Sequence, residues 1–272
     1  AYETALARTR EERRDSASNR VVLTKVGNRE TRITRNARLQ PASVTVRDTT
    51  TNQTRTTAYT YCEAADVAAS NSTCPILGML KSVDGPRTDV NDISTFVYYG
   101  SDDSTCASTP ALCTYRKGDL RKVTDALGRS VETLGYDPMG RPLSVLDPNG
   151  LVTDYVYDAR GRLTAAKERG PDDGTESDDR ITLLSYWMTG QIQSTRLPGE
   201  TALVYYYDAA QRLTGISDSG NNEIIYTLDK AGNRKKEDTE DGSSTLRRTL
   251  SRVYNSLGQL TAVKDASQNA TS

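Results

Sequence analysis

Apolar and polar positions alternate along this chain in short segments that end in turn-forming residues. The segment 136–163 reads YDPMGRPLSVLDPNGLVTDYVYDARGRL, in which a Tyr-Asp pair followed by Gly-Arg occurs twice, 21 residues apart. Alternation over a few residues is typical of a half-buried β-strand, because successive side chains point to opposite faces. An amphipathic helix is the competing interpretation, but units this short, bracketed by turns, leave no room for one. The pattern therefore predicts an all-β protein.

The same figure recurs at a nearly constant period. Its first positions are Tyr115, Tyr136, Tyr157, Tyr186, Tyr207, Leu228 and Tyr254. The intervals between them are 21, 21, 29, 21, 21 and 26 residues, and the two longer intervals contain the polar stretches 170–179 and 237–244. A fixed period with insertions confined to polar loops is the mark of a repeat architecture.

The residues after each motif position predict a hairpin turn. In Asp137-Pro138-Met139-Gly140 the Asp can accept backbone N–H groups, Pro fits the second turn position, and Gly fits a left-handed fourth position. The same spacing recurs at 125–128, 147–150, 158–161, 229–232 and 255–258. Each unit of 21 residues is therefore expected to contain two turns and two short strands.

The strands that flank the turn have a predictable face. Two residues before each motif position, and so on the same face, stand Leu134, Tyr155, Leu184, Tyr205, Tyr226 and Arg252. After the turn, Leu143, Leu163, Leu213 and Leu260 are each followed three residues later by Leu146, Ala166, Ile216 and Val263. A spacing of three does not keep both side chains on one face of a regular strand, so a β-bulge is expected there.

The composition favours thin sheets over a thick core. Hydrophobic residues make up 35% of the chain, mean hydropathy is -0.64, and 15 Tyr stand against one Phe and one Trp. Tyr pairs an apolar ring with a hydroxyl that can stay in water, which suits a half-exposed sheet. Because a lone hairpin is marginally stable, the hairpins are expected to pair edge to edge into one continuous sheet.

Charge and residue content restrict the chemistry. The net charge of -1 gives no basic footprint for nucleic acid. The chain has no His, which removes Ser-His-Asp and Cys-His pairs and His-bearing zinc sites. The 36 Asp and Glu residues are scattered through turns. We therefore expect no enzymatic activity, no cofactor and no metal site. No apolar run approaches the roughly 18 residues that a membrane span needs.

Tyr-Asp-x-x-Gly-Arg-Leu at a period near 21 resembles the YD repeat of the Rhs family, whose relatives include the C components of bacterial Tc toxins and the animal teneurins. The resemblance rests on YDPMGRPL (136–143), YDARGRL (157–163) and YDAAQRL (207–213). The repeat-motif residues so identified are Tyr136, Asp137, Gly140, Arg141, Leu143, Tyr157, Asp158, Gly161, Arg162, Leu163, Tyr207, Asp208, Arg212 and Leu213. The resemblance implies a continuous twisted β-strip that is part of a spiral shell around a variable C-terminal toxin domain.

Three regions follow from the repeat pattern. Residues 1–60 are a β-rich, weakly repeat-like segment, 61–114 are degenerate repeats with cysteine-bearing insertions, and 115–272 are regular repeats. Within the middle region, the stretches that begin at Tyr61 and Tyr99 are interpreted as repeats with long insertions. The acidic stretch DDGTESDD is interpreted as a solvated loop, because it lacks the order of ligands in a calcium loop.

The four cysteines, Cys62, Cys74, Cys106 and Cys113, all lie in these insertions. Three pairings are open in principle, and sequence proximity favours Cys62 with Cys74 and Cys106 with Cys113. Free thiols are the alternative. Local disulfides would suit a secreted or cell-surface location in a bacterium.

The leading hypothesis is a non-catalytic, structural piece of a shell, whose partners would be the rest of the same Rhs polypeptide and its enclosed toxin domain. The alternative is a surface module that binds carbohydrate or protein through a row of exposed rings at Tyr155, Tyr205 and Tyr226. Tyrosines buried against sheet or cargo would favour the shell, whereas an open row would favour the binding module.

Overall fold

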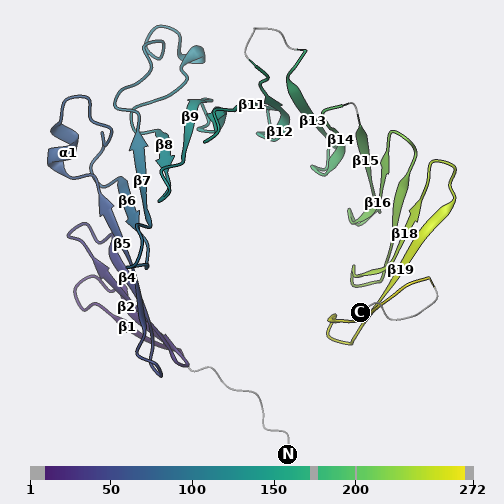
Figure 1. Cartoon of the computed structure of the whole chain (residues 1–272), viewed down its shortest axis with the longest axis horizontal. Helices are drawn as coiled ribbons and strands as arrows, with labels where there is room; N and C mark the ends of the chain where they lie inside the picture. The colour runs from purple at the N-terminus through teal and green to yellow at the C-terminus, as the bar shows by residue number, and fades with distance from the viewer. Residues whose placement is uncertain (1–9, 172–176, 200, 267–272) are drawn as a thin grey trace, which may run out of the picture. The chain divides into compact units, whose positions relative to one another are not determined.

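The computed structural model describes residues 10–171, 177–199 and 201–266, and these residues are almost entirely antiparallel β-structure (Figure 1). The all-β prediction is confirmed. The chain divides into two compact units, residues 1–152 and 153–272. This division differs from the three regions predicted from the repeat pattern, because it follows contacts between strands and not the regularity of the motif.

The first unit is a meander in which each strand pairs antiparallel with the next one in the chain. Its strands are β1 (Arg10–Arg14), β2 (Val21–Val26), β3 (Arg29–Arg35), β4 (Pro41–Asp48), β5 (Thr54–Tyr61), β6 (Leu80–Asp84), β7 (Ile93–Tyr98), β8 (Leu120–Thr124), β9 (Ser130–Tyr136) and β10 (Pro142–Leu146). The charged residues Arg10–Arg14 form β1 at the start of the described chain.

The second unit is built in the same way, again with sequential antiparallel pairing. Its strands are β11 (Val152–Tyr157), β12 (Leu163–Glu168), β13 (Arg180–Tyr186), β14 (Ile192–Arg196), β15 (Ala202–Tyr207), β16 (Leu213–Asp218), β17 (Glu223–Leu228), β18 (Arg234–Glu240), β19 (Leu246–Tyr254) and β20 (Leu260–Lys264). The short β11 begins at Val152, the last residue of the first unit.

The predicted β-bulge is present after the motif turns. In the β11–β12 hairpin, Tyr157 pairs with Leu163 but Val156 pairs with Ala165, so Thr164 is the additional residue. The Thr164 hydroxyl donates to the Val156 carbonyl at 3.1 Å. The same one-residue shift occurs in the hairpins β13–β14, β15–β16, β17–β18 and β19–β20. An additional residue on one strand increases the local twist, which is why the strand after the turn does not alternate regularly.

Two insertions interrupt the first unit, between β5 and β6 and between β7 and β8. The first contains α1 (Ala64–Ala68), and the second contains the 3-10 turn η1 (Pro110–Leu112). The backbone N–H of Glu63 donates to the side chain of Asp66 at 2.9 Å, which caps the start of α1. No described helix is long and apolar enough to cross a membrane.

Few of the described side chains are buried, as the composition predicts. One buried cluster consists of Cys62, Cys74 and Tyr98, with Met79, Phe96 and Leu120 partly buried around it. It lies where the first insertion folds over the sheet. Elsewhere the described strands form a single layer whose side chains are mostly half-exposed.

Candidate functional site

In the motif copies that contain Tyr-Asp, the aspartate closes the turn. In the β11–β12 hairpin, Oδ1 of Asp158 accepts the backbone N–H groups of Arg160 at 2.9 Å and Arg162 at 3.0 Å. Its Oδ2 accepts Nε–H of the Arg162 side chain at 2.8 Å. The backbone N–H of Gly161 donates to the Asp158 carbonyl at 2.8 Å. The Asp, Gly and Arg of the motif therefore form one hydrogen-bonded turn.

The turn holds its carboxylate ionised. The backbone N–H and then the guanidinium of Arg162 lower the pKa of Asp158 below its ordinary value. The Arg212 guanidinium has the same effect on the pKa of Asp208, followed by the Arg212 backbone N–H. The turn occupies acceptor atoms of both carboxylates, which gives the repeated Asp a structural role.

The fourth turn position has a left-handed backbone. Gly161 has φ of 82° and Gly140 has φ of 78°. Such a conformation is accessible to Gly without a steric penalty but costs about 1–2 kcal/mol for residues with a Cβ. The third full motif copy, YDAAQRL, places Gln211 here, with φ of 63°. Glycine is therefore preferred at this position but not required, since the copy at 207–213 has Gln211 there.

The motif tyrosine joins its hairpin to the preceding one. Its hydroxyl donates to the backbone carbonyl of the first residue in the second strand of the preceding hairpin, and we call this contact the inter-hairpin tyrosine bond. The described examples are Tyr61 to Pro41 (2.7 Å), Tyr98 to Leu80 (2.6 Å), Tyr136 to Leu120 (2.5 Å), Tyr186 to Leu163 (2.7 Å), Tyr207 to Ile192 (3.0 Å) and Tyr254 to Arg234 (3.2 Å). The acceptor carbonyls were not predicted, because they are contributed by residues of any type.

The Tyr and the Asp of the motif thus have different roles. Asp closes the turn within its own hairpin, whereas Tyr connects consecutive hairpins. In the β17–β18 hairpin the motif position is Leu228, which has no hydroxyl, although Asp229 still accepts the backbone N–H groups of Ala231 and Asn233 at 2.9 Å each. The two functions of the motif can therefore be separated in this chain.

Two positions in the β9–β10 hairpin differ from the sequence-based interpretation. Leu143 was assigned to the position of Leu163, but Pro142 pairs with Tyr136 and Leu143 is the additional residue of the bulge. Leu134 is skipped in the same pairing, so it does not follow the regular alternation of β9. The Pro at 142 displaces the apolar residue by one position, and the spacing to Tyr136 alone did not reveal this.

The motif position before Tyr136 was also misassigned. Tyr115 lies in the second insertion, stacked on Tyr99 with ring centroids 3.8 Å apart. Tyr98 ends β7 and makes the inter-hairpin tyrosine bond. The tyrosine at the strand end before Tyr136 is therefore Tyr98, one residue before the predicted Tyr99, and the insertion separates it from Tyr115.

One turn was missed in the weakly repeat-like region. Oδ1 of Asn36 accepts the backbone N–H groups of Arg38 and Gln40, both at 3.0 Å. The Asn36 amide also donates to the Gln40 side chain at 3.1 Å. Asn255 and Gln259 make the same contacts, with an amide pair in place of Asp and Arg. The shared Asn-x-x-x-Gln spacing is a sequence signal that could have identified this turn.

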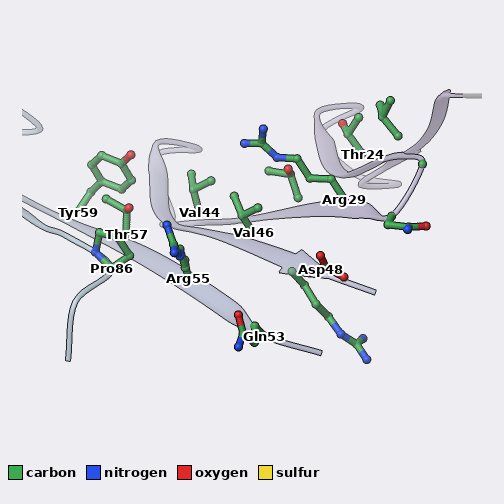
Figure 2. A pocket seen from close by; sticks show the side chains of 15 residues that line it. Thr24, Arg29, Val44, Val46, Asp48, Gln53, Arg55, Thr57, Tyr59 and Pro86 are labelled. Carbon is green, nitrogen blue, oxygen red and sulfur yellow. The ribbon is translucent and has the colours of Figure 1, made fainter. Parts of the chain in front are cut away.

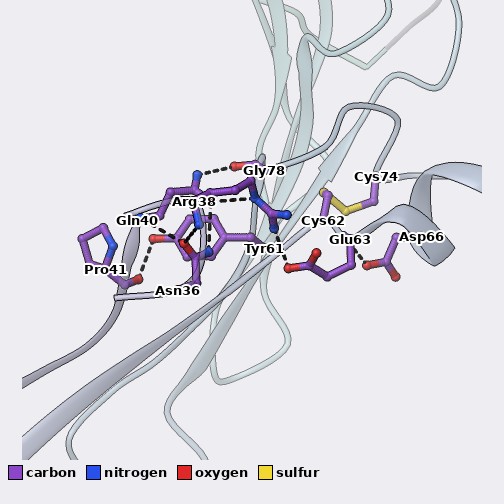
Figure 3. Close-up of polar contacts among 10 residues, drawn as sticks. All are labelled: Asn36, Arg38, Gln40, Pro41, Tyr61, Cys62, Glu63, Asp66, Cys74 and Gly78. Carbon is purple, nitrogen blue, oxygen red and sulfur yellow. Dashed lines mark hydrogen bonds and ion pairs between the residues drawn. A yellow bond between two sulfur atoms is a disulfide. The ribbon is translucent and has the colours of Figure 1, made fainter. Parts of the chain in front are cut away.

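The first insertion is held to this turn (Figure 3). The Gln40 amide donates to the Gly78 carbonyl at 2.7 Å, and the Arg38 guanidinium pairs with Glu63 at 2.5 Å. A disulfide joins Cys62 to Cys74, and Cys62 is fully buried. This pairing is the local one that sequence proximity favours.

The second insertion has its own internal order. A disulfide joins Cys106 to Cys113, the other local pair. Oδ1 of Asp103 accepts the Thr105 N–H at 2.9 Å, and Oδ2 accepts the Thr114 hydroxyl. The hydrogen bonds from Thr105 and Thr114 lower the pKa of Asp103 to about 2.

Tyr99 connects the start of the second insertion to β9. Its hydroxyl donates to the Thr133 carbonyl at 2.7 Å. Burial raises the pKa of Tyr99 to about 12.

The proposed tyrosine-binding face does not form an open row. Tyr155, Tyr205 and Tyr226 are each half-buried within the sheet. The Arg234 guanidinium lies 4.1 Å from the ring centroid of Tyr226 and covers it. Among the described residues, no group of three or more His, Cys, Asp or Glu side chains is placed to hold a metal ion.

Sequential hairpins, aspartate-closed turns and inter-hairpin tyrosine bonds define a tandem β-hairpin repeat protein. The family model described as RHS Repeat matches residues 115–150 and 140–174. Residues 115–174 of the chain are therefore Rhs/YD repeats.

Solved structures share this fold at low sequence identity. The crystal structure of TcdB2-TccC3 matches with a TM-score of 0.59 and 14% identity over 91% of this chain and 12% of that one. TcdB2-TccC3-TEV matches with a TM-score of 0.56 and 14% identity over 96% of this chain and 15% of that one. TcdB2-TccC3 without its hypervariable C-terminal region matches with a TM-score of 0.53 and 15% identity over 96% of this chain and 15% of that one. This chain therefore spans less than a sixth of each of them.

No curated protein matches the chain in sequence.

Proposed function

We propose that this chain is a non-catalytic, structural segment of an Rhs/YD-repeat shell that encloses a C-terminal toxin or effector domain. The observation that carries the proposal is the inter-hairpin tyrosine bond, as between Tyr186 and Leu163. It connects each hairpin to the one before, so that a single-layered sheet can be extended unit by unit without a thick core. Such a sheet can form a wall between two compartments with few residues, because it is only one layer thick.

The comparisons support this proposal at the level of the fold. The chain shares its fold with TcdB2-TccC3, a complex that has also been solved without a hypervariable C-terminal region. A variable domain that follows a constant repeat region is the arrangement expected of a shell with exchangeable cargo. For this chain, the enclosed domain is part of the proposal.

Two further features support the proposed role and location. The turn carboxylates, such as Asp158, accept hydrogen bonds from their own turn, which supports a structural role for them. The disulfides Cys62–Cys74 and Cys106–Cys113 suit an oxidising compartment, so we propose a secreted or cell-surface protein. The half-buried state of Tyr155, Tyr205 and Tyr226 gives no specific support to the alternative of a surface carbohydrate-binding module.

The test uses the natural polypeptide that contains this chain. Its mass is measured first, and then limited proteolysis is applied with the disulfides intact. We expect a segment after Ser272 that is resistant to protease in the whole polypeptide but is digested when produced alone. A natural product that ends at Ser272, or a following segment that is cleaved at equal rates in both contexts, would overturn the enclosure proposal.

A further inference from the structure

One face of the strands β2 to β5 forms a hollow of about 1120 Å³ in the first unit (Figure 2). The floor is apolar and contains Val44, Val46 and Pro86, with the ring of Tyr59 at one end. Val46 lies between Thr31 on β3 and Arg55 on β5 in the strand register. The hollow therefore belongs to one continuous face of neighbouring strands.

The hollow carries excess positive charge. Its charged lining residues are Arg29, Arg47, Arg55 and Asp48. Oδ1 of Asp48 accepts the backbone N–H groups of Thr50 at 2.7 Å and Thr51 at 3.0 Å, so the carboxylate is engaged in the β4–β5 turn. The N–H groups of Thr51 and then Thr50 lower the pKa of Asp48.

Two of the three arginines are available to a ligand. Arg47 donates to the Asn52 side chain at 2.5 Å. Arg29 and Arg55 are exposed, and neither forms an ion pair with any residue that the structure describes. Figure 2 shows both guanidinium groups projecting from the strands on the side of Val44 and Val46.

The spacing of these two arginines restricts what can bind. In the strand register, Arg29 on β3 lies opposite Asp48 on β4, and Arg55 on β5 lies opposite Val46 on β4. The two arginines are therefore two strands apart and two residues apart along the strand direction. With usual strand spacings, their Cα atoms are separated by about 12 Å. This separation is close to the distance between residues i and i+4 of an extended peptide, about 13 Å.

We propose that this hollow binds an extended acidic polypeptide segment, with two carboxylates four residues apart on Arg29 and Arg55 and apolar side chains on Val44 and Val46. Arginine matches a carboxylate with two parallel N–H donors. A polypeptide fits better than a glycan, because sugar rings need flat aromatic platforms and Tyr59 is the one aromatic side chain among the lining residues. The inference goes beyond the proposed structural role and stands whether or not the strip encloses a cargo.

The test is a fluorescence-anisotropy titration of the whole chain with a labelled, end-capped peptide TETVTETV, which has glutamates at i and i+4 and valines on the same face of the extended peptide. The same peptide with both glutamates replaced by glutamine is the ligand control. We expect saturable binding of the acidic peptide that weakens as salt is raised, because exposed charges are screened. The double variant Arg29→Gln/Arg55→Gln should reduce the affinity by roughly tenfold, since each ion pair is partly exposed.

Two variants keep the result interpretable. Arg248→Gln in β19 removes an exposed arginine from the other unit and should leave the affinity unchanged. Arg29→Lys/Arg55→Lys keeps the charge and should retain most of the binding. Circular dichroism of each variant is the check that it folds. The proposal is overturned if the acidic peptide does not bind, if the glutamine peptide binds equally well, or if Arg248→Gln has the same effect. Stronger binding of a sulfated hexasaccharide would assign the hollow to glycans instead.

Discussion

The hydroxyl of Tyr207 donates to the backbone carbonyl of Ile192 at 3.0 Å. Tyr207 ends β15 and Ile192 begins β14, so this one bond joins two consecutive hairpins. The motif tyrosine is therefore a connector between repeats, and the stability of the strip is expected to depend on its hydroxyl as well as on its ring.

Replacing Tyr207 by Phe tests this connection. The ring stays, but the Ile192 carbonyl loses its donor, so we expect the free energy of unfolding to fall by about 1 kcal/mol. Urea denaturation followed by circular dichroism measures the change. Tyr205→Phe in the same strand is the control, because no hydrogen bond of the Tyr205 hydroxyl is found among the described residues. Equal effects of the two substitutions would contradict the assigned role.

The natural exception at Leu228 allows the reverse experiment. Leu228→Tyr should supply the missing inter-hairpin tyrosine bond to the carbonyl of Leu213, the first residue of β16. We expect a gain of about 0.5–1 kcal/mol in the free energy of unfolding. Leu228→Phe adds a ring without a hydroxyl and should not reproduce this gain. If both variants are equally stable, the hydroxyl makes no contribution here.

The left-handed residue Gln211 should be improved by glycine. Its φ of 63° is unfavourable for a residue with a Cβ, and Gln211→Gly should stabilise the protein by about 0.5–1 kcal/mol, despite the greater freedom of Gly in the unfolded chain. Gly161→Ala, with φ of 82° at the equivalent position, should destabilise by a similar amount. Thermal unfolding of both variants measures the effect. A loss of stability in Gln211→Gly would show that the glutamine side chain has a stabilising contact.

Removal of the Cys62–Cys74 disulfide should destabilise the first insertion. The Cys62–Cys74 disulfide closes a loop with a sequence separation of 12, and Cys62 lies in the buried cluster beside Tyr98. Cys62→Ala/Cys74→Ala should lower the free energy of unfolding by about 3 kcal/mol. Cys106→Ser/Cys113→Ser should have a smaller global effect, because that disulfide closes a shorter loop, with a separation of 7. The reverse order in chemical denaturation would contradict this assignment.

Acid should loosen the second insertion through Asp103. Its pKa is lowered from 3.8 to about 2, so its stabilising contribution is fully present above about pH 4 and is lost as the pH falls through about 2. The difference in unfolding free energy between the wild-type protein and Asp103→Asn should therefore be largest near about pH 5 and shrink towards about pH 2. A difference that is independent of pH would show that the charge of Asp103 does not contribute.

The sequence by itself determined the local units. Alternation predicts the strands, and the Asp-x-x-Gly spacing predicts the turns, because both depend on residues within a few positions of one another. The bulge after Leu163 was predictable for the same reason. The β9–β10 hairpin also contains the expected bulge, but Pro142 lies opposite Tyr136 and Leu143 is the additional residue, a one-residue shift that the spacing alone does not reveal.

The tertiary structure decided which distant residues meet. Tyr98, and not Tyr115, bonds the preceding hairpin, because a folded insertion separates the two ends of its repeat. Likewise, Arg29 and Arg55 share one hollow only because β4 lies between their strands and fixes the register. Local patterns fix the form of each hairpin, whereas the partners of its side chains depend on strand pairing between residues far apart in the chain.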